Sequence, residues 1–253
     1  MLSVSRVRSV LALCVLGLLS ACATDPNDPF NDPYEDINRE IFALNDSMDR
    51  NVLVPVAEAY RDTVPEPVRQ SVTNGLRNLN TPLIFINEVL QGDMRGAEVA
   101  FNRFWINSFL GIGGLFDIAG MDPRLEYRSE DFGQTLAVWG VEPGPYLVLP
   151  LLGPSNPRDL AGLVGDQLMD PVRWVIQVET NWDAFGPSRF AATLVDRREA
   201  ALDALEEVRA SSLDYYAAIR SLYRQNREAE INDSDEVEPV DIPNYDVLEE
   251  DNG

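Results

Sequence analysis

Residues 101–120, FNRFWINSFLGIGGLFDIAG, limit what this chain can fold into more than any other segment. From residue 104 onward the run is apolar or glycine, with only Asn107, Ser108 and Asp117 as exceptions. A membrane-spanning helix needs about 20 apolar residues in a row, and each glycine inside a helix costs about 1 kcal/mol relative to alanine. Gly111, Gly113 and Gly114 therefore predict a bend. The segment is either a buried core element or a re-entrant segment that touches lipid, where protein or water must satisfy its irregular backbone.

Residues 1–21 are organised like a secretory leader. Arg6 and Arg8 precede an apolar stretch at residues 10–19, and Leu19-Ser20-Ala21-Cys22 follows. A positive start, an apolar centre and a cleavage site with small residues define a signal peptide. Its end resembles the lipobox of bacterial lipoproteins, which predicts cleavage before Cys22 and acylation of that cysteine. Two or more acyl chains anchor a protein stably, at about 0.8 kcal/mol per buried CH₂. The alternative is a secreted soluble protein with a chance cysteine.

The composition excludes several kinds of site. The chain has no histidine and no lysine, so all 20 basic residues are arginine, and the formal net charge is −22. Without histidine there is no Ser-His-Asp or Cys-His nucleophile and no histidine zinc ligand. Without lysine, residues 111–114 cannot form a Walker phosphate loop. We expect no metal and no cofactor, and an acidic chain is a poor partner for nucleic acid. The remaining enzymatic alternative is carboxylate acid–base chemistry, as in a glycosidase, but no acidic pair stands out.

The mature chain divides into three parts. Residues 22–32 are a tether rich in proline, aspartate and asparagine, and residues 33–227 form the folded body. Residues 228–253 contain eleven acidic residues and no basic one, with Pro239 and Pro243 among them. Such a segment cannot bury enough apolar surface to order itself, which predicts a disordered acidic tail that keeps the protein solvated.

Helical periodicity dominates the body, so we predict a mainly α fold with little strand. A helix is expected from Pro33 with Asp32 as its cap, since Ile37, Ile41, Leu44 and Met48 share one face. Further helices are expected to start at Pro67, after Asn80-Thr81-Pro82, at Asp93 and at Ser155-Asn156-Pro157, with Gly92 ending one of them. Residues 145–150 are expected to be extended. Residues 187–226 are expected to be helical, with one break at residues 210–212.

Several ordered blocks of residues resemble the VacJ/MlaA phospholipid-binding lipoproteins of Gram-negative outer membranes. The blocks are the lipobox at Cys22; Asp32-Pro33-Tyr34-Glu35 with Asn38-Arg39; Val54-Pro55-Val56-Ala57 with Tyr60-Arg61; residues 107–119, NSFLGIGGLFDIA; residues 131–136, DFGQTL; and residues 144–150, GPYLVLP, continuing to Arg158-Asp159. The resemblance covers about residues 30–180. One difference is that relatives can carry an Asn-Phe repeat in the first helix, where this chain has Ala43-Leu44-Asn45-Asp46.

The resemblance implies a single ring-like domain of short amphipathic helices around a central channel. It implies a lipoprotein, not an enzyme, anchored in the outer membrane and facing the periplasm. The position after Cys22 is alanine and not aspartate, which also favours the outer membrane. Such a protein removes mislocalised phospholipids from the outer leaflet and passes them to a soluble periplasmic carrier, which maintains lipid asymmetry. A trimeric porin is an expected partner. The alternative is a structural adaptor that binds porins without transporting lipid.

Site candidates follow from this resemblance and from the apolar runs. The candidates for lining the lipid channel are Phe104, Trp105, Phe109, Gly111, Gly113, Gly114, Phe116, Tyr146 and Leu149. The candidates for contacting a lipid phosphate are Arg103, Arg158 and Arg173, because a guanidinium binds phosphate in a bidentate fashion. For each arginine the alternative is an ion pair with a nearby carboxylate, such as Asp159 for Arg158.

Overall fold

Residues 31–180 and 182–232 are described by a computed structural model, and helices dominate them. The helices are α2 (Glu35–Met48), the π-helix η2 (Asp49–Leu53), α3 (Val54–Thr63), α4 (Glu66–Gln91), α5 (Met94–Phe109), the short 3₁₀ helices η3 (Ala119–Met121) and η4 (Pro123–Leu125), α6 (Phe132–Val138), α7 (Pro157–Met169), α8 (Pro171–Thr180), α9 (Phe185–Ala200), α10 (Leu202–Ser211) and α11 (Tyr215–Ile231). Two strands, β1 (Leu147–Leu149) and β2 (Gly153–Ser155), pair in antiparallel fashion. The predicted leader, Cys22, nearly all of the tether and the tail beyond residue 232 lie outside the described residues.

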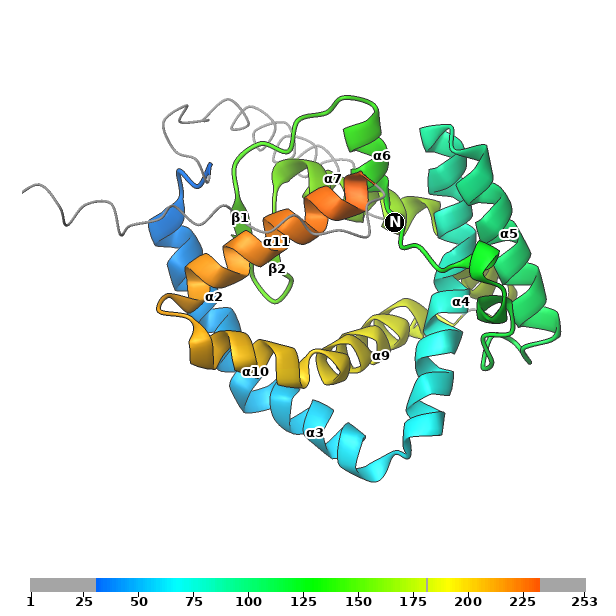
Figure 1. Cartoon of the computed structure of the whole chain (residues 1–253), viewed down its shortest axis with the longest axis horizontal. Helices are drawn as coiled ribbons and strands as arrows, with labels where there is room; N and C mark the ends of the chain where they lie inside the picture. The colour runs from blue at the N-terminus through cyan, green and yellow to red at the C-terminus, as the bar shows by residue number, and fades with distance from the viewer. Residues whose placement is uncertain (1–30, 181, 233–253) are drawn as a thin grey trace, which may run out of the picture.

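The helices follow one another around a ring (Figure 1). Along one side, α2, η2 and α3 continue each other as one long helical rod, and α4 and α5 pack against each other on the opposite side. Contacts between elements close the ring. Helix α3 contacts α9, and both α9 and α8 contact α4, which in turn contacts α6. Helix α11 then contacts α6 and β2, and β1 contacts α2. The predicted mainly helical, ring-like single domain is therefore confirmed.

Two of the expected helix starts were wrong. Helix α2 starts at Glu35, and its N-cap residue, Tyr34, makes no side-chain cap. Asp32 is instead buried, where it accepts hydrogen bonds from Asn38, Tyr216 and Arg220. The carboxylate of Asp32, which the sequence predicted to be a helix cap, is instead the centre of a polar cluster. This cluster joins the two ends of the described chain.

The second correction concerns Pro82, which was expected to open a helix. It lies inside α4, a single helix of 26 residues, so not all helices of this body are short. Proline removes one hydrogen bond from a helix interior and strains the preceding turn, at about 3 kcal/mol. Buried side chains surround it, because Thr81, Leu83 and Ile84 are all nearly inaccessible. Packing of α4 on α5 therefore outweighs the local cost.

The remaining boundaries agree better with expectation. Gly92 ends α4 in the left-handed conformation, at φ 87°, and Asp93 caps α5 by accepting from the N–H of Arg95. Asn156 caps α7, and the expected extended segment contains β1. The break in the C-terminal helices that was predicted at residues 210–212 lies at residues 212–214, and a second break lies at Ala201. Helix α11 continues to Ile231, so residues 228–231, which were expected to belong to the tail, are helical.

Two asparagines of α2 hold the short strand β1 in place. Asn38 donates to the carbonyl of Tyr146 at 3.0 Å and accepts from the N–H of Val148 at 2.9 Å. Seven residues, or about two turns, later, Asn45 donates to the carbonyl of Leu149 and accepts from the N–H of Leu151, both at 2.8 Å. A side-chain amide has a donor and an acceptor, so each asparagine satisfies the strand backbone as a neighbouring strand would.

Candidate functional site

Among the described residues, large apolar side chains lie mainly on the outside, and many polar side chains are buried. Among the described residues, exposed large hydrophobic residues outnumber buried ones, and the most deeply buried large side chains are Gln134, Asn38 and Asn87. Soluble monomers rarely expose large contiguous apolar patches, and such patches mark protein or membrane contacts. The surface of this protein is therefore built to meet something other than water.

One apolar surface feature is a ladder of aromatic rings on α5. Phe101, Trp105 and Phe109 are 50%, 44% and 70% exposed and lie four residues apart, on one face of the helix. Trp105 and Phe109 are stacked, with ring centroids 4.9 Å apart and planes inclined by 4°. Phe85 of α4 extends the ladder, with its ring 6.2 Å from that of Phe101. We call Phe85, Phe101, Trp105 and Phe109 the aromatic ladder.

The expected glycine bend follows the ladder directly. Residues 110–118 turn back on the end of α5, with the N–H of Gly113 donating to the carbonyl of Ser108 and that of Gly114 to the carbonyl of Asn107. Gly113 and Gly114 have φ of 71° and 91°, which L-residues other than glycine rarely adopt. A Cβ on Gly114 would collide with Asn78 of α4, and one on Gly111 with the carbonyl of Phe116, whereas Gly113 faces open space.

The bend presents more apolar side chains to the outside. Leu110, Ile112, Leu115 and Phe116 are all exposed, and they continue the surface of the aromatic ladder. Beneath them the turn is held by a polar cluster, in which Asp117 accepts from Arg103 and from Asn107. The backbone and polar side chains of this segment pack against protein, as the core explanation expects. Its exposed apolar side chains leave contact with lipid as a prediction.

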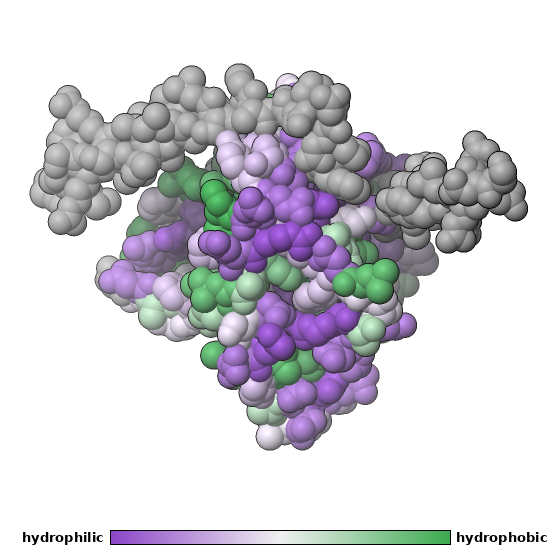
Figure 2. Space-filling model, turned by 90° about the vertical axis from the view of Figure 1, so that its left-hand side faces the viewer, coloured by the Kyte–Doolittle hydropathy of each residue, from purple (hydrophilic) through white to green (hydrophobic). Residues whose placement is uncertain are grey.

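Two other regions of the ring carry exposed apolar stripes. On α2, η2 and α3 the stripe consists of Ile37, Leu44, Met48, Val52 and Val56. On α7 and α8 it consists of Leu160, Leu163, Val164, Leu168, Trp174, Val175 and Val178. Figure 2, which views the molecule from the left-hand side of Figure 1, shows hydrophobic areas at the surface between broad hydrophilic ones. None of the described helices is both long enough and apolar enough to span a bilayer. Amphipathic helices of this kind suit a position in the membrane interface.

Buried and partly buried ion pairs link distant parts of the ring. Arg220 pairs with Asp32 at 2.6 Å, Arg198 with Asp49 at 2.7 Å, and Arg227 with Asp131 at 2.7 Å. Each of these pairs joins a C-terminal helix to an element far away in the sequence. Burial on its own would raise the pKa of Asp131, but the hydrogen bonds and charge of Arg227 outweigh it, so the pKa is lowered. Removing one partner of such a pair is costly.

The structure brings most of the expected channel residues together. Phe104, Trp105, Phe109, Gly111, Gly113, Gly114 and Phe116 all lie on α5 or in the bend after it. Tyr146 and Leu149 lie elsewhere, on and next to β1. Tyr146 is only 3% exposed and packs with Val148 and Tyr216 in the hydrophobic core, while Leu149 is half-buried.

The three candidate arginines are spread over the molecule. Arg103 is 4% exposed and binds both carboxylate oxygens of Asp117 at 2.9 Å, as well as the carbonyl of Leu125. Arg158 is buried next to Asp159, with 3.3 Å between Nε and Oδ1. Arg173 donates to the side chain of Gln167 at 2.6 Å. For Arg103 and Arg158, the alternative of a carboxylate partner is what the structure contains.

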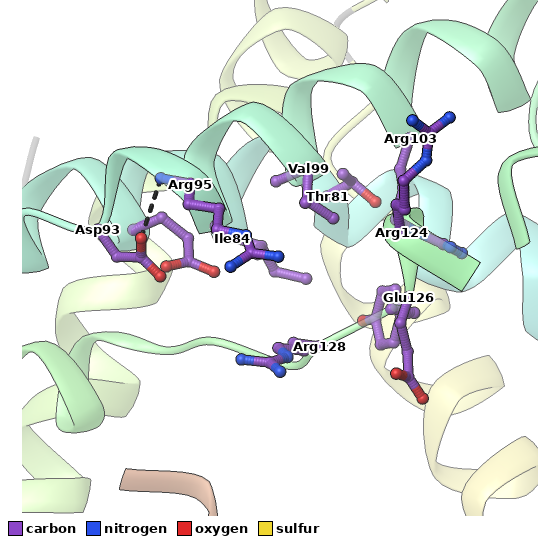
Figure 3. A pocket seen from close by; sticks show the side chains of 13 residues that line it. Thr81, Ile84, Asp93, Arg95, Val99, Arg103, Arg124, Glu126 and Arg128 are labelled. Atoms are coloured by element: carbon purple, nitrogen blue, oxygen red, sulfur yellow. Dashed lines mark hydrogen bonds between the residues drawn. The ribbon is translucent and has the colours of Figure 1, made fainter. Parts of the chain in front are cut away.

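A cavity that the sequence did not indicate lies between α4, α5 and residues 124–128 (Figure 3). Its volume is about 300 Å³. Four arginines and three carboxylates line it: Arg95, Arg103, Arg124, Arg128, Glu88, Asp93 and Glu126. These charged residues come from separate segments, so no local sequence pattern predicts the site. The part of the chain that the structure describes holds no group of histidine, cysteine or carboxylate side chains suited to a metal ion.

Comparison with known proteins identifies the family. The family model described as MlaA lipoprotein matches residues 30–230. A Haemophilus influenzae protein named intermembrane phospholipid transport system lipoprotein MlaA is 35% identical over 225 residues, which are 87% of each chain. The protein of the same name from Escherichia coli is 35% identical over 240 residues, 92% of each chain. An uncharacterised Rickettsia felis protein is 36% identical over 201 residues, covering 79% of this chain and 78% of that one.

A solved structure described by the words "Structural basis for maintenance of bacterial outer membrane lipid asymmetry" has the same fold. The two superpose with a TM-score of 0.70 at 35% sequence identity, over 79% of this chain and 99% of the other. Family model, relatives and fold all cover the body whose ring, glycine bend and exposed apolar surface are described above. The chain belongs to the MlaA lipoprotein family.

Proposed function

We propose that this protein is an outer-membrane lipoprotein that removes mislocalised phospholipids from the outer leaflet and passes them to a soluble periplasmic carrier. The phospholipid would pass through a channel in the middle of the ring, and the result would be maintained lipid asymmetry. The relatives named as phospholipid transport lipoproteins and the neighbour connected with outer-membrane lipid asymmetry support this role. The role requires no catalysis.

One observation carries the proposal. The described part of the molecule exposes large apolar side chains on several elements of the ring while many polar side chains are buried, and the aromatic ladder is one example. A surface of this kind is stable where hydrocarbon replaces water. Phospholipids have a polar and an apolar part, so a route bounded by both kinds of side chain suits them.

The anchor and the partners complete the proposal. Acylated Cys22 would hold the body on the periplasmic face of the outer membrane, and a trimeric porin would hold it in place next to the bilayer. A Cys22→Ser variant tests the anchor. It should no longer incorporate labelled palmitate or be processed like the natural chain, and it should keep part of its membrane affinity through the exposed apolar surface. Normal processing without label in the natural chain would contradict the anchor.

The decisive experiment for lipid handling is a mass spectrum of what copurifies with the full chain in mild detergent. Transport predicts a stoichiometric diacyl phospholipid, released by organic solvent. The adaptor alternative predicts a porin in the preparation and no stoichiometric lipid. Muropeptide release from cell wall by the pure protein would support the enzymatic alternative.

A further inference from the structure

The cavity between α4, α5 and residues 124–128 supports a specific ligand. We infer that it binds the zwitterionic headgroup of an amine-bearing phospholipid, with the phosphate at Arg95 and the ammonium at Glu126. This inference rests on the proposed function and adds to it the class of lipid that the protein selects.

Two charged side chains on the cavity lining are free to bind such a headgroup. Within residues 31–180 and 182–232, neither the guanidinium of Arg95 nor the carboxylate of Glu126 has a hydrogen bond or ion pair. Arg95 extends from the first turn of α5 and Glu126 from the segment after η4, so the two lie in different parts of the lining (Figure 3). A cation and an anion without protein partners on the lining of one cavity suit a ligand that carries both charges.

The other charges make the cavity selective. Arg103 is occupied by Asp117, and Arg124 by Asp122 at 2.7 Å. Asp93 accepts from the N–H of Arg95. Counting all seven charged side chains, the lining carries one more positive charge than negative charges. That excess is small, and the carboxylates would repel an isolated phosphate dianion. A zwitterion meets complementary charge at both ends, and such complementarity gives specificity.

The rest of the lining suits the carbon part of the ligand. Ile84, Val99 and Ala100 form an apolar wall, and Thr81 and Tyr127 add polar groups. A volume of about 300 Å³ is at the lower end of the range for small-molecule sites, which suits a headgroup and not a whole lipid. Gly96 lets the carboxylate of Glu88 lie against α5, since a Cβ there would collide with it.

The test is headgroup preference in the purified full chain in mild detergent. The probes are dihexanoyl phosphatidylethanolamine and dihexanoyl phosphatidylglycerol, with binding measured by titration calorimetry. The natural chain should prefer phosphatidylethanolamine. Glu126→Gln should weaken binding of that lipid by roughly 3- to 10-fold and leave phosphatidylglycerol unchanged, because only the first has an ammonium group. Arg95→Gln should weaken both. Arg61→Gln, which removes a half-buried arginine outside the cavity, is the matched control and should change neither.

Three results would overturn the inference. Equal binding of both lipids by the natural chain would leave lipid transport standing and remove the headgroup site. A preference that survives in Glu126→Gln would place the selective group elsewhere. Free phosphoethanolamine that binds as tightly as the lipid would assign the cavity to a soluble phosphate ester. By contrast, a chain that binds neither lipid would contradict the proposed function itself.

Discussion

In the glycine bend, a glycine is required for one or both of two reasons: its backbone conformation or the lack of space for a side chain. Gly113 has open space where a side chain would be, so it is required only for its positive φ. Gly114 has a positive φ and also lies against Asn78. A run of glycines in the sequence predicts a bend, but it does not say which glycine is required for which reason. The distinction depends on α4, which is distant in the sequence.

This difference predicts unequal costs for the same substitution. Gly113→Ala should lower the free energy of unfolding by about 1 kcal/mol, the usual cost of a left-handed residue with a Cβ. Gly114→Ala should cost roughly 2–4 kcal/mol, because overpacking adds to the backbone strain. Thermal unfolding in mild detergent, followed by circular dichroism, measures both. Equal costs would show that Asn78 moves aside freely. The result also bears on Gly113→Leu, which should not overpack the protein, so any loss of lipid transport in that variant would be an effect on the surface of the bend.

Asp166 on α7 makes stability depend on pH. It accepts from the amide of Asn87 and the N–H of Phe132, and burial, with the nearby charge of Asp131, raises its pKa to about 6. An unfolded aspartate titrates near pH 3.9. The folded protein therefore holds this proton more tightly, and ionisation of Asp166 lowers stability as the pH rises from about 4 to above 6.

Asp166→Asn removes this penalty while keeping an acceptor oxygen. The variant should be more stable than the natural chain by about 1–2 kcal/mol at pH 7.5 and should have no advantage at pH 4. Melting temperatures at the two pH values measure the difference. Asp203→Asn, at a side chain that is 94% exposed, is the control. An advantage of Asp166→Asn that is the same at both pH values would contradict the explanation.

Among the elements, α11 makes the ionic contacts that join the C-terminal part of the described chain to α2, α6 and α7. Its Arg220 binds Asp32 ahead of α2, and its Arg227 binds Asp131 at the start of α6 and Asp159 in α7. Tyr223 adds a hydrogen bond to Asp159. The sequence predicted the helix but not these ionic contacts, because every partner is more than 60 residues away.

The Arg227 cluster gives a prediction with a matched control. Arg227→Gln should lower the free energy of unfolding by about 3 kcal/mol, since it leaves two partly buried carboxylates without their cation. Arg61→Gln also removes one arginine that pairs with an aspartate, but its partner is almost fully exposed, so it should cost less than about 1 kcal/mol. Chemical unfolding of both variants provides the comparison. Similar losses in both would show that α11 is not held by its buried charges.

At the scale of the whole molecule, the sequence predicted most of the helices but not what their apolar faces contact. Period-3.6 patterns locate apolar faces, and the strand at residues 147–149 followed from the flanking Pro145 and Pro150. The pattern cannot say what an apolar face meets. Ile37, Leu44 and Met48 look like the core side of α2, yet all three are exposed. The sequence did not predict the cavity between α4, α5 and residues 124–128, because its charged residues come from three separate segments.

The exposed ladder predicts contact with hydrocarbon. In a variant that keeps Trp105 and replaces Trp139, Trp174 and Trp182 by phenylalanine, tryptophan fluorescence reports on one ring of the ladder. In bilayer nanodiscs, lipids with brominated acyl chains should quench this fluorescence strongly, and aqueous iodide should quench it weakly. The opposite order would place the ladder in water or against a protein partner.

The central claim is that the protein keeps phospholipid out of the outer leaflet of the outer membrane. The most direct test is to label surface-accessible phosphatidylethanolamine with a membrane-impermeant amine reagent in cells that contain or lack the protein. The account predicts more labelled lipid in cells without the protein, and restoration of the normal level by the natural chain at normal abundance. Equal labelling with and without the protein, in cells whose outer membrane is otherwise intact, would contradict the account.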